Sequence, residues 1–598
     1  MLNNRNSYIY PFIFIYLFGA YSVVLFGNYL FHDDWIAFIF DNETFMRSIH
    51  GHSYYMSNIQ MGRPIATIFT SIGHYFLNTI HDGSWLRAVN IAILSISASL
   101  LFKWMDRLGY NKIFSLFFVC TAFTLPPFHM MAIQVNSQHL VIALLLTISA
   151  IIVLNNYITK QDLFDNSRLY KITFFLFNFI VIAILLQFIP KFLLILSMSL
   201  VLFGILHYIY NIKINKQAKI SESLSFVLVV YYLQFAMNIY VAVSMFLFAA
   251  IVIFLFAPQN TFPNKNSIIN SSKLLLIGIL SVLLYFINMK LFMHFDNLDY
   301  SSAGREFLMD YDFIKKITFY YSVILPKSLS LWIYDKAIID SLSNFVWLPM
   351  VIFVALLFKD YKDKAILRFY TLVITCLCII ISVLPIIAHS YWAPYRTMLS
   401  HSMMIYFLLL WILYNLISSV KQYFSVSLLR FNYFNLTVIS SAIMLISASF
   451  LSNKEIYHNI VFPHQYELNY IRNELIKNNI KSKLENKKAE IVVKTYHDLS
   501  FLKENNGKED AISITYEKFS WLPNVLIAIS REHGFKGVIT RANFQENVER
   551  DSNGSIVKMS FIFPFGKLIM SADENKLPNP LSDKNIIYID MNKLGKIY

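Results

Sequence analysis

Charged residues are scarce in this chain. Lys, Arg, Asp and Glu make up 14% of its 598 residues, whereas soluble proteins contain roughly 25%. This scarcity excludes an ordinary soluble globular domain. Cysteine is also rare, and Cys120, Cys376 and Cys378 all lie in apolar runs, which predicts buried reduced thiols and no disulfide framework. The sequence shows no internal repeat and no low-complexity tract.

Apolar residues dominate instead. Hydrophobic residues make up 57% of the chain, and Phe alone occurs 54 times. Apolar runs of about 18 residues or more are typical of membrane-spanning helices. The first run is long for a signal peptide, and Gly27-Asn28-Tyr29 is not a convincing cleavage site, so we interpret it as a retained helix. We predict thirteen spans, near 8–31, 84–103, 111–125, 140–157, 172–188, 191–210, 221–237, 239–257, 273–294, 344–358, 368–387, 398–417 and 432–451.

Positive charge predicts which side of the membrane each loop faces. The net charge is +14, and with a cytoplasmic N-terminus the predicted cytoplasmic loops, such as "KWMDRLGYNK" at 103–112, hold many Lys and Arg, whereas the short outer loops hold few. Nucleic-acid binding is a poor interpretation, because these basic residues are dispersed between spans. The same bias requires 221–257 to cross twice, as two short helices turned around Met237-Asn238. It also keeps 63–80 on the outer surface as a juxtamembrane helix.

The predicted fold is mostly α: a polytopic helix bundle followed by a small α/β domain. Residues 1–452 form the transmembrane domain, with outer loops at 31–83 and 295–343. After 452, charged residues of both signs become frequent. "YELNYIRNELIKN" and "WLPNVLIAISREHG" predict helices, and "EIVVKTY", "AISIT", "GVIT" and "NIIYID" predict short strands. The number of spans places this domain, 453–598, on the outer, periplasmic side.

Two adjacent carboxylates, Asp33 and Asp34, follow the first apolar run in "YLFHDDWIAF". Their charge places them at the outer water interface. They could simply end the helix and face solvent. However, the dipole of a helix C-terminus disfavours anions, so the pair conflicts with local electrostatics in the way expected of a functional site.

A family resemblance begins here. The acidic pair is followed by "RSIHGHSYYMSNIQMGRPIA" at 47–66, and this combination resembles the bacterial O-antigen-modifying glucosyltransferases of the serotype-conversion type. These belong to the GT-C-like polytopic transferases that use polyprenyl-phosphate sugars. The resemblance is sharpest over 31–66, with looser support from "YLQFAMNIY" and "PYRTMLSHS". Arg47 stands thirteen residues after Asp34, farther than the family pattern places its arginine.

The resemblance implies an inverting sugar transfer at the periplasmic face of the inner membrane of a Gram-negative bacterium or its phage. The donor would be a sugar, most often glucose, on undecaprenyl phosphate, and the acceptor a lipid-linked glycan such as O-antigen. A carboxylate can act as the general base for the acceptor hydroxyl, and we favour Asp33, oriented by Asp34. Arginine and lysine suit the donor phosphate. The candidates are Arg47, Arg63, Arg305, Lys327 and Arg396 for phosphate, and Gln234, Asn238, His389 and Tyr395 for the sugar or acceptor.

Each of these candidates also has a structural interpretation. Arg63 could anchor its helix at lipid headgroups, and Arg305 and Lys327 could do the same in the second outer loop. Arg396 lies in an aromatic segment of the kind common at membrane interfaces. Gln234 and Asn238 could satisfy neighbouring helices. His32, His50, His52, His74 and His81 crowd the first outer loop but show no zinc-protease spacing, so we expect no metal cofactor, with a loosely bound Mg²⁺ left open.

Two other functions compete with transfer. A polysaccharide polymerase or ligase would also need outer basic residues, but not an acidic pair after the first span. A flippase or transporter would place ionisable residues near the middle of the membrane and use repeats or broken helices. The C-terminal domain shows no nucleophile and base pattern, so we expect it to support the bundle or dock the glycan.

Overall fold

The described part of the chain is mostly helical. A computed structural model describes residues 8–27, 29–30, 63, 65–77, 79–135, 137–159, 220–258, 265–295, 312–334, 336–359, 364–387, 395–423, 433–477, 489–494, 545–550, 556–563, 566–571, 577 and 586–590. The first group of helices comprises α1 (Ile9–Ala20), α2 (Ser22–Phe26), α5 (Ala66–Tyr75), the 3₁₀ helix η3 (Ile80–Asp82), α6 (Gly83–Arg107), α7 (Lys112–Ala122), α8 (Pro126–Ile133) and α9 (Gln138–Thr159).

The second group begins with α12 and contains two π-helical turns. It comprises α12 (Ile220–Ser244), α13 (Phe246–Leu255), α14 (Lys265–Phe295), α15 (Phe313–Phe319), the π-helix η6 (Tyr320–Ile324), α16 (Leu325–Leu329), α17 (Lys336–Ser343), α18 (Trp347–Leu357), α19 (Ala365–Ile387), the 3₁₀ helix η7 (Tyr395–Thr397), α20 (Leu399–Tyr423), α21 (Tyr433–Ile456), the π-helix η8 (Tyr457–Val461) and α22 (Phe462–Lys477).

The apolar helices indicate a multi-pass membrane protein. Five of the described helices are long and apolar enough to cross a membrane, and the number rises to eight if each of three bent pairs is one span. The first predicted span is broken, because α1 ends at Ala20 and α2 begins at Ser22. The predicted spans at 172–188 and 191–210 lie outside the described residues. Thirteen spans, and the side that each end faces, therefore stay predictions.

The predicted turn around Met237-Asn238 is wrong. Helix α12 continues through both residues, and its backbone leaves helical geometry at Tyr240, where φ is −161° and ψ is 100°. A second break separates α12 from α13, which are bent by 80° relative to each other. The turn fails because the Asn238 side-chain amide donates to the Gln234 carbonyl at 2.7 Å, a bond within one helical turn. The break in the helix therefore comes after Asn238 in the chain, at Tyr240.

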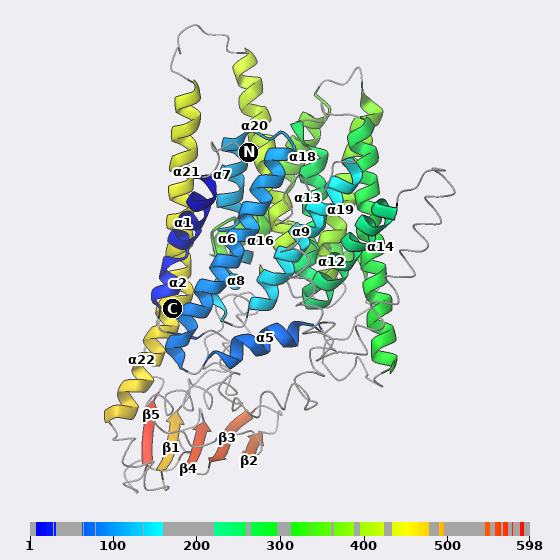
Figure 1. Cartoon of the computed structure of the whole chain (residues 1–598). Coiled ribbons are helices and arrows are strands. Elements are labelled where there is room, and N and C mark those ends of the chain that lie inside the picture. The colour runs from blue at the N-terminus through cyan, green and yellow to red at the C-terminus, as the bar shows by residue number, and fades with distance from the viewer. Residues whose placement is uncertain are drawn as a thin grey trace.

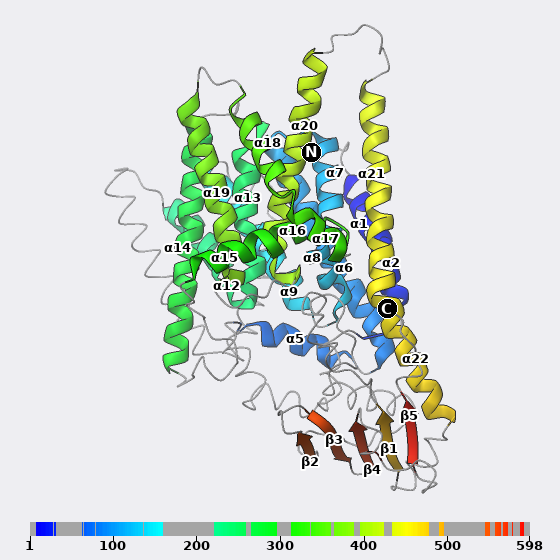
Figure 2. The ribbon, with the colours of Figure 1, turned by 180° about the vertical axis from the view of Figure 1, so that it is seen from behind.

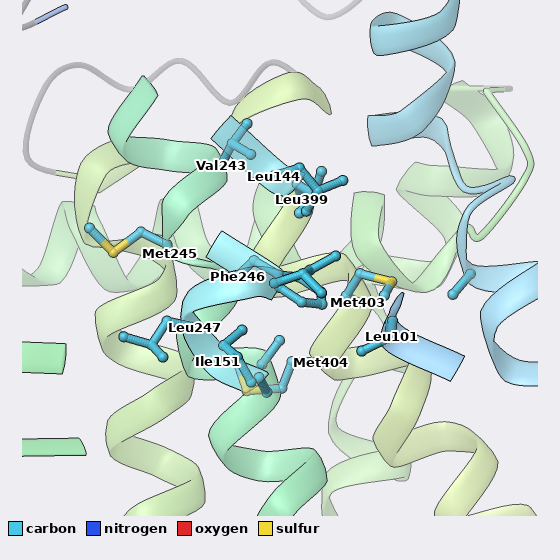
Figure 3. Close-up of a cluster of buried hydrophobic side chains, with 14 of the residues drawn as sticks. Leu101, Leu144, Ile151, Val243, Met245, Phe246, Leu247, Leu399, Met403 and Met404 are labelled. Atoms are coloured by element: carbon cyan, nitrogen blue, oxygen red, sulfur yellow. The ribbon is translucent and has the colours of Figure 1, made fainter. Parts of the chain in front are cut away.

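Apolar side chains fill the space around the bend. Figure 3 shows Phe246 and Leu247 of α13 beside Met403 and Met404 of α20, with Leu144 and Ile151 of α9 and Leu101 of α6 in the same cluster. Methionine is unbranched and flexible, so it fits the irregular gaps that a bent helix leaves. The bend is therefore part of the packed core.

One helix lies across the others. Figures 1 and 2 both show α5 running crosswise at the lower end of the bundle, between the long helices and the β-strands. A helix within the predicted range 63–80 is thus confirmed, whereas its place on the outer surface of the membrane stays a prediction. Figure 2 also shows α15, α16 and α17 running across the long helices, which brings the 312–343 region against the bundle.

The strands form one sheet below α5. They are β1 (Ala489–Lys494), β2 (Gln545–Arg550), β3 (Ile556–Phe563), β4 (Gly566–Ser571) and β5 (Ile586–Asp590), in the order β2-β3-β4-β1-β5. β1 pairs in parallel with β4 and β5, whereas β2, β3 and β4 pair antiparallel. Helix α22, which continues α21 through η8, contacts β5 and links the bundle to the sheet.

Two of the four predicted strands are confirmed, as β1 and β5, and the first predicted helix of this region appears as α22. The predicted strands at 511–515 and 537–540 and the predicted helix at 521–534 lie outside the described residues. The α/β domain as a whole therefore stays a prediction.

Candidate functional site

Arg63 stands at the start of the crosswise helix. Its carbonyl accepts from the Ala66 amide at 3.1 Å, and the next described amide, that of Ile65, donates to the Asn238 carbonyl at 3.3 Å. These bonds tie the beginning of α5 to α12. The half-buried guanidinium lies over the ring of Tyr240, with its Cζ atom 4.2 Å from the ring centroid. Among the described residues, no side chain accepts a hydrogen bond from this guanidinium, which has five N–H donors.

Tyr240 marks the break in α12. It is 2% exposed, and its ring also lies 5.9 Å from the ring of His139, centroid to centroid. His139 Nδ1 lies 3.5 Å from Thr70 Oγ1, so the ring is close to α5 as well. The break thus gathers an arginine, a tyrosine and a histidine from three elements. Sequence reasoning did not single out Tyr240, although this residue ends the segment "YLQFAMNIY", and it missed His139, which stands in no motif.

Gln234 and Asn238 lie on α12, six and two residues before Tyr240. The Gln234 amide donates to the Ser281 carbonyl at 2.6 Å, and Asn288 donates to its Oε1 at 3.4 Å, so both ends of the side chain join α12 to α14. Gln234 therefore has a structural role. Asn238 is fully buried, and among the described residues nothing bonds to its Oδ1. Of these two residues, it is Asn238 that has a side-chain acceptor to which no described residue donates.

Lys327 and Tyr395 form a second group. Lys327 lies in the short helix α16, and its Nζ is 5.4 Å from the centroid of the Tyr395 ring. Tyr395 begins η7, is 4% exposed, and meets Tyr334 edge to face at 5.2 Å. Arg396 follows in η7 and is half-buried. Since η7 contacts α12, the two groups border the same helix.

A buried arginine holds the end of the first helices. Arg87, near the start of α6, is 0% exposed. Its Nε donates to the Ile133 carbonyl at 3.0 Å, its Nη1 to the carbonyls of Gly27 (3.1 Å) and Val24 (3.3 Å), and its Nη2 to the Tyr29 carbonyl. The guanidinium also lies 4.0 Å from the centroid of the Tyr29 ring.

The last carbonyl groups of a helix have no N–H partner within the helix, and the bonds from Arg87 supply that partner. Val24 is in α2, and Ile133 is the last residue of α8, so one cation serves two helix C-termini, where positive charge is favoured. Sequence reasoning overlooked Arg87, although an arginine inside a predicted span is a signal in itself. Leu30 is the last described residue before the acidic pair, so Arg87 holds the backbone that leads into it.

The remaining candidates cannot be placed. Asp33, Asp34, Arg47, Arg305 and His389 lie outside the described residues, as do His32, His50 and His52. Of the other histidines in this region, His81 is exposed in η3. Within the described residues no three His, Cys, Asp or Glu side chains gather as metal ligands. The expectation of no metal cofactor stays untested.

Comparison with known proteins finds no relative. No protein-family model matches the chain, and no curated protein matches it. The residues at the lower end of the bundle are therefore the basis for a functional proposal.

Proposed function

We propose that the chain is a membrane glycosyltransferase that moves a sugar from undecaprenyl phosphate to a lipid-linked surface glycan such as O-antigen. Glucose is the sugar that we expect. The observation that carries this proposal is the Arg63 guanidinium, held over Tyr240 with no acceptor among the described side chains. A half-buried guanidinium over an aromatic ring suits a phosphate, because its donors can bind two phosphate oxygens at once.

The surroundings of Arg63 support a lipid-linked donor. The crosswise helix that follows it lies at one end of the apolar bundle, where a phosphate headgroup would meet the protein while its polyprenyl chain stayed in lipid (Figure 1). Lys327 and Arg396 supply further positive charge around the same helix α12. The unused Asn238 Oδ1 could accept a sugar hydroxyl. Resemblance to the serotype-conversion glucosyltransferases at 31–66 points the same way.

The proposed step is a single displacement. The acceptor oxygen forms a bond to the anomeric carbon while the bond from that carbon to the phosphate oxygen breaks. The acceptor proton passes to Asp33, and undecaprenyl phosphate leaves with the bonding electrons. Arg63 stabilises the negative charge on the leaving phosphate, so no strong acid is required. One displacement inverts the configuration at the anomeric carbon.

The test is transfer by the purified protein in lipid nanodiscs, with a glucosyl undecaprenyl phosphate donor and a lipid-linked O-antigen acceptor. We expect Arg63→Ala to lower kcat/KM about a hundredfold, as removal of one preorganised charge contact often does. The control is Arg107→Ala, because Arg107 is exposed at the other end of α6. Equal loss in both variants, or no transfer by the wild-type protein, would refute the proposal. Asp33→Asn and Asp34→Asn then test the base, and full activity in both would exclude it.

A flippase for a lipid-linked glycan is the second candidate. Three helix pairs are bent by 48°, 60° and 80° at short breaks, and broken helices are common in transporters. A fluorescent lipid-linked glycan in sealed vesicles separates the two functions. Movement across the bilayer without sugar transfer would favour the flippase.

A further inference from the structure

His129 lies where a histidine is least expected. It belongs to α8 and is 0% exposed, between the apolar residues Phe128 and Met130. Its Nε2 is 2.6 Å from the Thr124 carbonyl and 2.8 Å from Ser452 Oγ, and its Nδ1 is 2.7 Å from the Tyr334 hydroxyl. The ring of Tyr21 meets it edge to face at 5.9 Å. Every polar atom of the imidazole therefore has a partner.

These partners decide where the protons lie. A carbonyl oxygen can only accept, so Nε2 carries the proton that points at Thr124 and Ser452. In a neutral imidazole the other nitrogen is then an acceptor, and the Tyr334 hydroxyl donates to Nδ1. Burial raises the pKa of Tyr334 well above its ordinary value, with Tyr395, Tyr21 and Glu455 adding in that order, so its phenol remains a donor.

The same region clamps the segment that carries Tyr334. Leu331 has φ of 53°, the left-handed conformation that costs a non-glycine residue about 1 kcal/mol or more. Such strain persists only where neighbouring contacts impose it. Here Trp332 Nε1 donates to Thr124 Oγ1 at 3.0 Å, and Tyr334 donates to His129. Two bonds to the 124–129 stretch thus hold the residues that directly follow Leu331.

Further contacts connect this turn to Lys327. Ser330 Oγ donates to the Lys327 carbonyl at 2.9 Å, which joins the turn to α16. The Tyr334 ring meets the Tyr395 ring at 89°, and Lys327 Nζ lies above the Tyr395 ring. Tyrosine faces attract ammonium groups, so the Tyr395 ring favours one position for Nζ. A change at His129 would reach Lys327 through only two rings.

We infer that His129 and Tyr334 are positioning residues that fix Lys327 as a binding cation for the phosphate of a lipid-linked ligand. The identity of that ligand rests on the proposed function, but the fixed place of Lys327 does not. The bonds at His129 orient Tyr334, the Tyr334 ring supports Tyr395, and Tyr395 holds the ammonium group.

Tyr334→Phe tests this positioning role, because it removes only the hydroxyl oxygen that bonds to His129. The control is Tyr110→Phe, because the Tyr110 hydroxyl also makes a buried bond, 2.6 Å to the Ile253 carbonyl, and its ring packs against Phe114 and Phe407. The first readout is the rate at which Lys327 is acetylated by a small reagent, measured by mass spectrometry without ligand. We expect about a fivefold faster rate in Tyr334→Phe, as the net strength of one hydrogen bond predicts, and no change in Tyr110→Phe. Equal rates in the two variants would overturn the inference.

Two substitutions of His129 sharpen the result and stay informative if one fails to fold. The Asn oxygen occupies the place of Nδ1 and still accepts from Tyr334, whereas the Gln amide occupies the place of Nε2 and loses that acceptor. We expect His129→Asn to keep the slow Lys327 acetylation and His129→Gln to raise it about fivefold. The opposite order would contradict the proposed path.

Transfer kinetics separate this inference from the proposed function. If both hold, Tyr334→Phe raises KM for the donor about fivefold and leaves kcat within about twofold. If wild-type protein transfers no sugar but Lys327 acetylation still follows His129 and Tyr334, the proposed function fails and the positioning role stands. If transfer proceeds and neither donor KM nor acetylation changes in Tyr334→Phe, the positioning role fails alone.

Discussion

Two arginines at the same end of the bundle differ in almost every respect. Arg87 is fully buried and donates to four backbone carbonyls from α2, the residues after it and α8. Arg63 is half-buried and has one described neighbour for its guanidinium, the ring of Tyr240. Both cations lie over a tyrosine ring, at 4.0 Å and 4.2 Å from the centroid. What separates them is the use of the N–H donors.

This difference separates a structural cation from an available one. The donors of Arg87 satisfy the protein itself, so a ligand could bind only by breaking those bonds. The donors of Arg63 find no acceptor among the described side chains, so a phosphate could bind there without such a cost. Arg63, next to a break in a helix and with no acceptor among the described side chains, is therefore the stronger candidate for binding a substrate.

Replacement of Arg87 should have the largest effect. Arg87→Leu leaves four buried carbonyls without a donor, and loss of a buried hydrogen-bonded charge costs about 3–5 kcal/mol. We expect little folded protein, measured as the monodisperse fraction after detergent extraction. Arg87→Lys keeps the charge but loses the planar guanidinium and its several donors. We therefore expect its yield of folded protein to lie between those of Arg87→Leu and the wild-type protein. Arg63→Leu should fold like the wild-type protein, and equal yields for the Arg87 and Arg63 variants would contradict the distinction.

Gly27→Ala should have the next largest effect. A Cβ atom there would lie 2.6 Å from the Tyr29 ring and 2.9 Å from Val461 Cγ1. Gly27 has ordinary extended dihedrals, so the cost comes from this clash alone. Tyr29 cannot retreat freely, since Arg87 lies over its ring. We expect a loss of about 2 kcal/mol, typical of overpacking, seen as a lower Tm.

Tyr240→Leu should affect the ligand more than the fold. It removes the ring that holds Arg63, and a cation–π contact at a partly exposed site is worth about 1 kcal/mol. We expect KM for the lipid-phosphate donor to rise about fivefold. The matched test is the double variant, because Tyr240→Leu should add nothing once Arg63 is Ala. An equal effect with and without Arg63 would show that the ring acts independently.

Gly73→Ala should have the smallest effect. Its Cβ would meet Gln138 Oε1 at 2.5 Å, but that atom is the far end of a flexible side chain and has no hydrogen-bond partner among the described residues. Gly73 also lies inside α5, where alanine is favoured by about 1 kcal/mol. The clash and the helix preference should nearly cancel. A Tm loss as large as that of Gly27→Ala would show that the Arg63 region is as tightly packed as the Arg87 region.

Much of the helical framework could be predicted from hydropathy. The runs at 140–157, 368–387 and 398–417 correspond to α9, α19 and α20, because a span of apolar residues needs no distant partner to be recognised. Charge parity predicted a helix at 63–80 that stays on the surface, and α5 lies within that range. The sequence predicted a turn at Met237-Asn238 but not its true position at Tyr240, which depends on bonds between α12, α14 and α5.

The candidate site was predicted less completely. Arg63, Asn238, Lys327 and Tyr395 were chosen by motif and by position near a predicted outer loop. The structure divides them into Arg63 and Asn238 near Tyr240, and Lys327 over Tyr395. Arg87, His129 and His139 were missed because each acquires its partners from elements far away in the sequence. Gln234 was chosen, but its amide is used to join α12 to α14.

By itself, the sequence determined that this is a membrane protein with many apolar helices, because hydropathy is a property of each segment alone. It also placed acids and arginines next to the helix ends, because charge avoids lipid. Only the tertiary structure decided which arginine donates to backbone carbonyls and which one meets no acceptor among the described side chains. That distinction depends on which carbonyls and rings come within hydrogen-bonding distance when distant helices pack, and no local pattern records it.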